Sequence, residues 1–304
     1  MNWHSNKARQ AAIVFLSLIT CATLPGSAAP IPEGRHQETV NLGGIALEVF
    51  TYRPKHCTPT AVLLVFHGLH RGVEDNLDDL HKISNELCLL EAVPLFDEQR
   101  FPGWRYQKGG IVYHGHVLPA DQWTGNLALR VVDWIRQAEN RPDLPYMLIG
   151  HSAGGQFLSR FAAYIPNHAL RIVIANPSSH VWPSVDVEAP FGFKGVYSPD
   201  QAELALRNYL AQPVTMVLGE SDTGDKDRDD EPAAAAQGKN RYQRGINAFH
   251  AAQAEAERRG WRFNWQLIEL PGVGHSTADV FESKQVKQVL RDAAAEHLPD
   301  GAGR

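Results

Sequence analysis

Short apolar runs alternate along this chain with longer segments whose apolar residues recur at helical spacing. The run at 61–66 is apolar throughout, which is typical of a strand buried on both faces, and a further strand is expected at 214–219. Segment 74–89 places its apolar residues on one side of a helix. This alternation predicts an α/β fold with a mostly parallel central sheet and helices on both faces.

The same two periodicities predict the remaining elements. Gly43-Gly44 separates two strand-like runs, at 40–42 and 45–52, and predicts a hairpin turn. Segments 97–119 and 177–200 show no clear period, and we expect the second to form a surface excursion or a small cap. The other expected elements are strands at 92–96, 171–175 and 263–270, a strand ending at 150, and helices at 122–138, 154–164, 201–210, 240–259 and 284–297.

The amino terminus has the pattern of a secretory signal peptide. Lys7 and Arg9 precede an apolar run at 11–24, and small residues follow it. We therefore expect residues 1–28 to be removed by cleavage after Ala28, which would make the protein secreted or periplasmic. The apolar run is short for a membrane span, although an uncleaved anchor is the alternative.

Residues 29–304 are predicted to form a single domain. The chain has 304 residues, of which 43% are apolar, and this is enough for one large core. Its net charge is −5 and it has no basic stripe, which argues against a nucleic-acid partner. No later segment is apolar enough to predict stable membrane insertion.

Two cysteines, Cys57 and Cys88, remain after the predicted cleavage. One precedes a predicted strand and the other ends the helix that follows it, so a crossover unit would place both at one edge of the sheet. An oxidising compartment would allow them to form a disulfide. In the chain-entropy model, a loop of this size contributes about 3–4 kcal/mol.

A predicted nucleophile stands between a strand and a helix. Ser152 lies in the pattern Gly150-x-Ser-x-Gly154, which is typical of the nucleophile elbow of serine hydrolases. Glycines are needed there because side chains at these positions would collide with the neighbouring backbone. The alternative is an ordinary turn serine.

An acid and a base follow in the chain order that sheet-based serine hydrolases use. Asp222 comes just after the predicted strand at 214–219, and His275 lies in a glycine-rich loop after the last predicted strand. Such a histidine can activate a serine while the carboxylate orients it. Glu220 and the acids of segment 225–231 are competing candidates for the acid.

An oxyanion would need backbone donors near the predicted nucleophile. Gly68 follows the strand at 61–66 and allows a turn that directs the amide of Leu69 inward. The amide of Ala153 stands at the start of the helix after Ser152. We expect Leu69 and Ala153 to be the donors, and His67 to brace the loop.

Aromatic residues in the long loops are candidates for a substrate pocket. Trp104, Tyr106 and Trp123 could line an apolar acyl or alcohol pocket, and ordinary loop packing is the alternative.

The sequence predicts neither a metal nor a cofactor. The alternating acids of segment 225–231 resemble a calcium loop, but solvated loop charge is the better explanation for them. The pair His114 and His116 lacks further ligands at suitable spacing.

Taken together, these motifs resemble those of the α/β-hydrolase superfamily over about residues 38–298. Two further segments resemble a group of secreted bacterial α/β-hydrolases often labelled esterase-like or polyester-depolymerase-like. The resemblance implies a triad of Ser152, Asp222 and His275. It is carried by segments 63–68, 150–155, 219–222 and 272–275, and for the smaller group by 96–104 and 237–245.

The expected activity is hydrolysis of a carboxylic ester through an acyl-enzyme on Ser152. The substrate would be a small or polymeric ester. Amide, peptide or thioester cleavage by the same triad is one alternative. A secreted binding protein on a hydrolase scaffold, without turnover, is the other.

Overall fold

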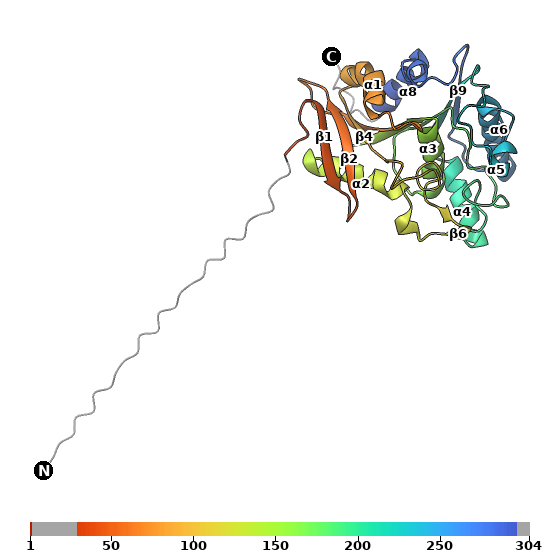
Figure 1. The fold of residues 1–304 in the computed structure, drawn as a ribbon, viewed down its shortest axis with the longest axis horizontal. Coiled ribbons are helices and arrows are strands. Elements are labelled where there is room, and N and C mark those ends of the chain that lie inside the picture. Colours follow the sequence, from red (N-terminus) through yellow and green to blue (C-terminus); the bar gives the residue numbers. More distant parts are fainter. Residues whose placement is uncertain (2–28, 297–304) are drawn as a thin grey trace.

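The computed structural model describes Met1 and residues 29–296, so the predicted signal peptide lies almost wholly outside the described part. Within that part, no helix is both long and apolar enough to cross a membrane. An eight-stranded sheet forms the centre, with helices on either side of it (Figure 1).

The strand order of the sheet is β1-β2-β4-β3-β7-β8-β9-β10. Strands β1 and β2 run antiparallel to their neighbours, and every pair from β4 to β10 is parallel, which confirms the predicted mostly parallel sheet. The strands are β1 (Gly34–Asn41), β2 (Ala46–Arg53), β3 (Ala61–Phe66), β4 (Leu89–Pro94), β7 (Tyr146–His151), β8 (Ile172–Ala175), β9 (Val214–Gly219) and β10 (Gln266–Leu270).

The central strands separate two apolar cores. In β3, Leu63 and Val65 pack into one core, while Leu64 and Phe66 pack into the other. Successive side chains of a strand point to opposite faces, so a strand between two cores must be apolar throughout. This explains the continuous run seen at 61–66.

Helices cover both faces, as predicted. Figure 1 shows α1 and α8 together on one side of the sheet, where their apolar residues and those of α7 share one core. Helices α2, α3, α4 and α6 contribute to the other core.

The helices of the two layers are α1 (Val73–Leu87), α2 (Gly125–Ala138), α3 (Ala153–Tyr164), α4 (Pro199–Leu210), α6 (Arg241–Arg259), α7 (Thr277–Phe281) and α8 (Lys284–Ala295). The short elements in the loops are β5 (Val112–Tyr113), β6 (His116–Val117), the 3-10 turn Ala120–Gln122 and α5 (Pro232–Ala235).

The junction between α1 and β4 differs from the prediction. The helix was expected to reach residue 89 and the strand to begin at residue 92, but only Cys88 separates them. Cys88 adopts a left-handed conformation (φ 54°), and its amide donates to the Ser84 carbonyl. This single cap residue turns the chain directly from helix to strand, so no loop is needed.

Segment 177–200 begins in the interior of the protein, unlike the surface excursion that its irregular pattern predicts, and several of its later residues are exposed. Ser178, Ser179 and His180 are buried. From α3, Gln156 donates to the Ser178 hydroxyl at 2.9 Å and Arg160 donates to the Ser179 carbonyl at 2.8 Å, while Gln237 binds the backbone of His180. The polar character of residues 178–180 therefore reflects internal hydrogen bonding rather than exposure.

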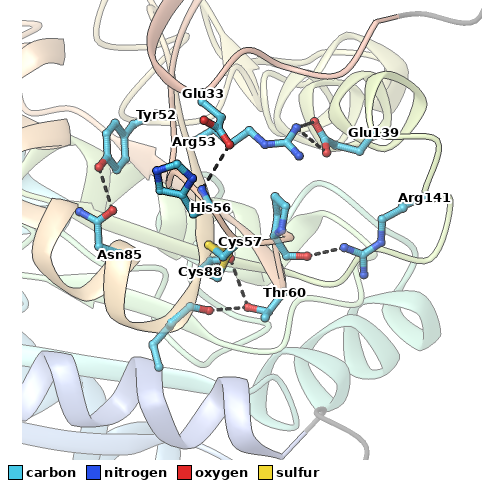
Figure 2. Close-up of a disulfide and its surroundings, with 12 residues drawn as sticks. Glu33, Tyr52, Arg53, His56, Cys57, Thr60, Asn85, Cys88, Glu139 and Arg141 are labelled. Carbon is cyan, nitrogen blue, oxygen red and sulfur yellow. Dashed lines mark hydrogen bonds and ion pairs between the residues drawn. A yellow bond between two sulfur atoms is a disulfide. The ribbon is translucent and has the colours of Figure 1, made fainter. Parts of the chain in front are cut away.

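Cys57 and Cys88 are joined by a disulfide, with their Cα atoms 6.2 Å apart (Figure 2). It ties the loop before β3 to the end of α1. Beside it, the Thr60 hydroxyl donates to the Leu87 carbonyl at 2.7 Å. The bridge and the hydrogen bond thus hold the same helix end against the sheet.

Candidate active site

Ser152 occupies a strained turn between β7 and α3. Its backbone has φ 56° and ψ −114°, a region that non-glycine residues rarely adopt. Its amide donates to the Ala175 carbonyl at the end of the neighbouring strand, at 2.9 Å. Strain of this kind persists where the surroundings hold it, and it is common at reactive residues.

Three glycines make this turn sterically possible. A Cβ on Gly154 would lie 2.0 Å from the Phe66 carbonyl oxygen, and one on Gly150 would lie 2.6 Å from the backbone of Gly154. The pattern did not single out Gly155, yet a Cβ there would lie 2.6 Å from the Ala175 carbonyl oxygen. The elbow therefore packs by backbone contact against both neighbouring strands.

The three side chains predicted as a triad form a continuous hydrogen-bonded line. The Ser152 hydroxyl lies 2.9 Å from Nε2 of His275. Nδ1 of His275 donates to Oδ2 of Asp222 at 2.7 Å. Asp222 is almost fully buried, whereas His275 is partly exposed. The arrangement allows the imidazole to take the serine proton while the carboxylate holds its tautomer.

Adjacent strand ends explain why these residues meet. Parallel strands end at one edge of the sheet, and β7, β8, β9 and β10 are consecutive there. The loops carrying Asp222 and His275 are also joined directly, since the Ser221 amide donates to the Val273 carbonyl at 2.9 Å. Gly219 permits this contact, because a Cβ there would lie 2.5 Å from the Val273 oxygen.

A buried arginine completes the environment of Asp222. Nη1 of Arg241 lies 3.4 Å from Oδ1 of Asp222, and both side chains are at most 2% exposed. The same guanidinium donates to the carbonyls of Gly224 and Lys226, which fixes the loop after the acid. Sequence reasoning missed this role, because an arginine at the start of an amphipathic helix resembles a surface residue.

Asn176 is a second residue that the sequence did not reveal. It follows β8 in a left-handed conformation (φ 43°). Its Oδ1 accepts from the Gly219 amide at 2.8 Å, and its Nδ2 lies 3.3 Å from the Gly274 carbonyl. One side chain thus links the end of β9 to the loop that carries His275.

His151, beside the nucleophile, is held as a neutral ring. Burial lowers its pKa well below the ordinary value, and the charges of His275 and Arg241 act in the same direction. Its Nδ1 lies 2.9 Å from the Thr277 hydroxyl, and its ring centroid lies 4.6 Å from that of His275. It therefore supports the loop of the base without competing for the serine.

His67 braces the loop after β3. Its Nε2 accepts a hydrogen bond from the Phe96 amide at 3.1 Å, so the proton of the neutral ring sits on Nδ1, which donates to the Gly68 carbonyl at 3.0 Å. Burial lowers the pKa of His67 to about 4. A neutral ring satisfied on both nitrogens fixes the path of the chain toward Leu69.

The two amides predicted to bind an oxyanion flank the nucleophile. Leu69 lines the same cavity as Ser152, and Ala153 is the first residue of α3. Neither amide donates a hydrogen bond to another group of the described chain. A helix N-terminus and a free loop amide are suitable donors for developing negative charge.

Ser152 and His275 open into a cavity of about 540 Å³. Its lining is polar rather than aromatic, so the predicted aromatic pocket is wrong at this position. Tyr106 is fully buried because its hydroxyl donates to the His67 carbonyl at 2.7 Å. Trp123 is 5% exposed and lines a separate hollow with Trp104.

Trp104 lies near the cavity that holds Ser152. A smaller hollow lined by Trp104 shares Leu69 and Asp227 with that cavity. Leu69 and Asp227 therefore stand between the cavity at Ser152 and the hollow at this tryptophan.

Most acids of segment 225–231 pair with protein groups. Asp229 accepts from the Ser179 hydroxyl at 3.0 Å, and Asp230 accepts from Arg228 at 2.8 Å. Glu231 pairs with Lys108. In the described ranges, no group of three His, Cys, Asp or Glu side chains is arranged to hold a metal ion.

Solved structures of hydrolases resemble this chain. LpqC, a poly(3-hydroxybutyrate) depolymerase from Bordetella parapertussis, shares 31% identity over 89% of this chain and 93% of its own, with a TM-score of 0.79. Poly(aspartic acid) hydrolase-1 from Sphingomonas sp. KT-1 shares 26% identity over 86% of this chain and 100% of its own, also with a TM-score of 0.79.

A more distant similarity concerns the fold alone. FphF, a fluorophosphonate-binding serine hydrolase from Staphylococcus aureus, shares 15% identity over 88% of this chain and 99% of its own, with a TM-score of 0.54. No protein-family model matches the sequence, and no curated protein matches it.

Proposed function

Because this chain is an enzyme of the α/β-hydrolase superfamily, we propose that it hydrolyses carboxylic esters through an acyl-enzyme on Ser152. One observation carries the proposal: Ser152, His275 and Asp222 are linked by hydrogen bonds of 2.9 and 2.7 Å, and Ser152 and His275 line an open cavity. An isolated serine hydroxyl is a weak nucleophile, and this linkage is what activates it.

The first half-reaction forms the acyl-enzyme. The Ser152 oxygen attacks the ester carbonyl carbon while Nε2 of His275 takes the hydroxyl proton. Asp222 stabilises the imidazolium that results. The oxyanion lies between the amides of Leu69 and Ala153, and His275 then protonates the alkoxide oxygen as the ester bond breaks.

The second half-reaction releases the acid. Water enters after the alcohol has left, and His275 takes its proton as the water oxygen attacks the acyl carbon. The Ser152 oxygen leaves with that proton, which restores the free enzyme. Each step moves a proton over one hydrogen-bond length, and the rigid ends of β7, β9 and β10 maintain these distances.

A secreted or periplasmic location fits this proposal. The pattern at 1–28 predicts a signal peptide, and the Cys57–Cys88 bridge is the kind of bond that persists in oxidising compartments. The substrate would then be an extracellular small or polymeric ester.

Turnover of a short-chain aryl ester by Ser152→Ala tests the mechanism. We expect this variant to lose turnover and to resist covalent labelling by a fluorophosphonate probe, while Ser198→Ala, which removes an exposed hydroxyl at the start of α4, keeps both. Wild-type turnover or labelling of the Ser152→Ala protein would exclude an acyl-enzyme at this residue.

A further inference from the structure

Four carboxylates line the cavity at Ser152. Asp75, Asp78 and Asp79 come from α1, and Asp227 comes from the loop after β9. Its ionisable lining otherwise consists of histidines, and no lysine or arginine of the described chain contributes to it. Any substrate that reaches the nucleophile must therefore enter a negative field.

Two of these carboxylates have partners. Asp78 pairs with Arg35, and Asp227 lies 3.5 Å from Nε2 of His70. The other two, Asp75 and Asp79, form no ion pair with any group of residues 29–296. The negative charge of the cavity is therefore only partly compensated by the protein.

The position of Asp79 is electrostatically costly. Burial and, to a lesser extent, the charges of Glu282, Asp75 and Asp279 together raise its pKa to about 6. Asp75 and Asp79 are four residues apart on one helix, a spacing at which like charges repel. Asp75 is placed favourably at the amino end of α1, but Asp79 lies too far along the helix to gain from its dipole.

Asn76 also belongs to this cavity. It lines the same hollow and is only 5% exposed. Its Nδ2 donates to the Gly72 carbonyl. Asn76 therefore adds a neutral polar group beside the carboxylates and no compensating positive charge.

We propose that this cavity selects esters carrying a positively charged ammonium group near the scissile bond, and rejects anionic esters. The inference rests on the proposed ester hydrolysis at Ser152. Asp75 and Asp79 would supply the attraction. The carboxylates are too dispersed to ligate a metal together, which suits a broad organic cation.

Matched substrate pairs test the charge preference on both sides of the ester. Acetylcholine and its carbon isostere neohexyl acetate differ only by charge in the alcohol. The para-nitrophenyl esters of γ-trimethylammoniobutyrate and of its carbon isostere differ only by charge in the acyl group, and the glutarate monoester adds a negative charge there. We expect kcat/KM to favour the cation in at least one pair by about ten-fold at low salt, and to be lowest for the anion.

The variants Asp79→Asn and Asp75→Asn/Asp79→Asn should bring the cation-to-neutral ratio close to one. Asp143→Asn makes the same charge change at an exposed site before β7, at the opposite edge of the sheet, and should leave the ratio unchanged. Added salt should lower the wild-type ratio but not that of the double variant.

The outcomes separate the two proposals. If neutral esters are hydrolysed but the wild-type cation-to-neutral ratio of kcat/KM is near one, the charge selection is refuted and the ester hydrolase stands. The same conclusion follows if the double variant keeps the wild-type ratio. If no ester is hydrolysed and Ser152 is not labelled by a fluorophosphonate, both proposals fail.

Discussion

Arg241 and Asp222 share a buried contact on the side of the carboxylate that His275 does not use. Nη1 of Arg241 lies 3.4 Å from Oδ1, while His275 binds Oδ2 at 2.7 Å. The guanidinium therefore fixes the rotation of the carboxylate and balances its charge away from water. Arg241 is a positioning residue that acts on the base through the acid.

Replacing Arg241 by methionine should lower both stability and turnover. Removing one partner of a buried pair leaves an uncompensated charge, which costs about 3–5 kcal/mol in the free energy of unfolding. Misplacing the carboxylate should lower kcat by about a hundred-fold. Urea unfolding and ester kinetics measure the two effects.

Two further variants show whether the activity loss is specific to this contact. Arg241→Lys should recover part of kcat, since it restores the positive charge. Arg207→Met, at an exposed position of α4, should change neither quantity. An Arg241→Met protein with wild-type kcat would show that the arginine serves stability alone.

Gly154→Ala should prevent the elbow from closing. The added methyl group would lie 2.0 Å from the Phe66 carbonyl oxygen, so β3 and α3 would have to separate. We expect destabilisation of about 3 kcal/mol, with loss of turnover, because overpacking a rigid contact forces the backbone to shift. Gly224→Ala, where a Cβ meets no atom within 4 Å, is the matched control and should be nearly neutral. Thermal unfolding of both variants decides the point.

Glu91, a fully buried residue of β4, should make stability depend on pH. Burial raises the pKa of its carboxyl from 4.5 to about 8. As pH rises through this window, the unfolded chain loses the proton while the folded chain keeps it, so the free energy of unfolding should fall and then level above pH 8. In Glu91→Gln this fall should be much smaller.

Urea unfolding at pH 5, 7 and 9 measures the Glu91 effect. Glu257→Gln, at an exposed position of α6, should keep the wild-type pH dependence. If the free energy of unfolding changes with pH equally in the wild type and in Glu91→Gln, Glu91 does not titrate between pH 5 and pH 9.

The charge preference of the cavity should weaken in acid. The pKa of Asp79 is raised to about 6, so this carboxylate is charged at pH 7.5 and mostly protonated at pH 5. We expect the cation-to-neutral ratio of kcat/KM to fall over this range, while pH effects on the triad cancel because both substrates use it. The Asp79→Asn protein should give a ratio independent of pH, and a wild-type ratio that stays constant would exclude Asp79 as the source of the preference.

Local patterns predicted the strands well where burial on both faces of the sheet requires a continuous apolar run. Strands β3 and β9 match the expected ranges 61–66 and 214–219, and every residue of both strands is buried. The sharp turn at Cys88 was missed, since one left-handed residue leaves no compositional signal. The short helix α7 was missed for a similar reason, because five residues are too few to show a period.

Aromatic residues show where residue type alone misleads. Tyr106 and Trp123 have the composition expected of a pocket, yet both are buried in the core. A large apolar side chain is stabilised equally by a ligand or by neighbouring side chains, and only the surrounding chain decides which is present. Arg241 and Asn176 were overlooked for the opposite reason, because polar residues are usually exposed.

The sequence by itself determined the alternation of strands and helices and the order of Ser152, Asp222 and His275, each just after a strand. Those features depend on spacing along the chain, and parallel strands bring their ends to one edge regardless of the details. Only the tertiary structure decided which oxygen of Asp222 binds Arg241 and which carboxylates of α1 border the nucleophile. Such contacts join residues far apart in the chain, so their distances and their charge depend on how the layers pack.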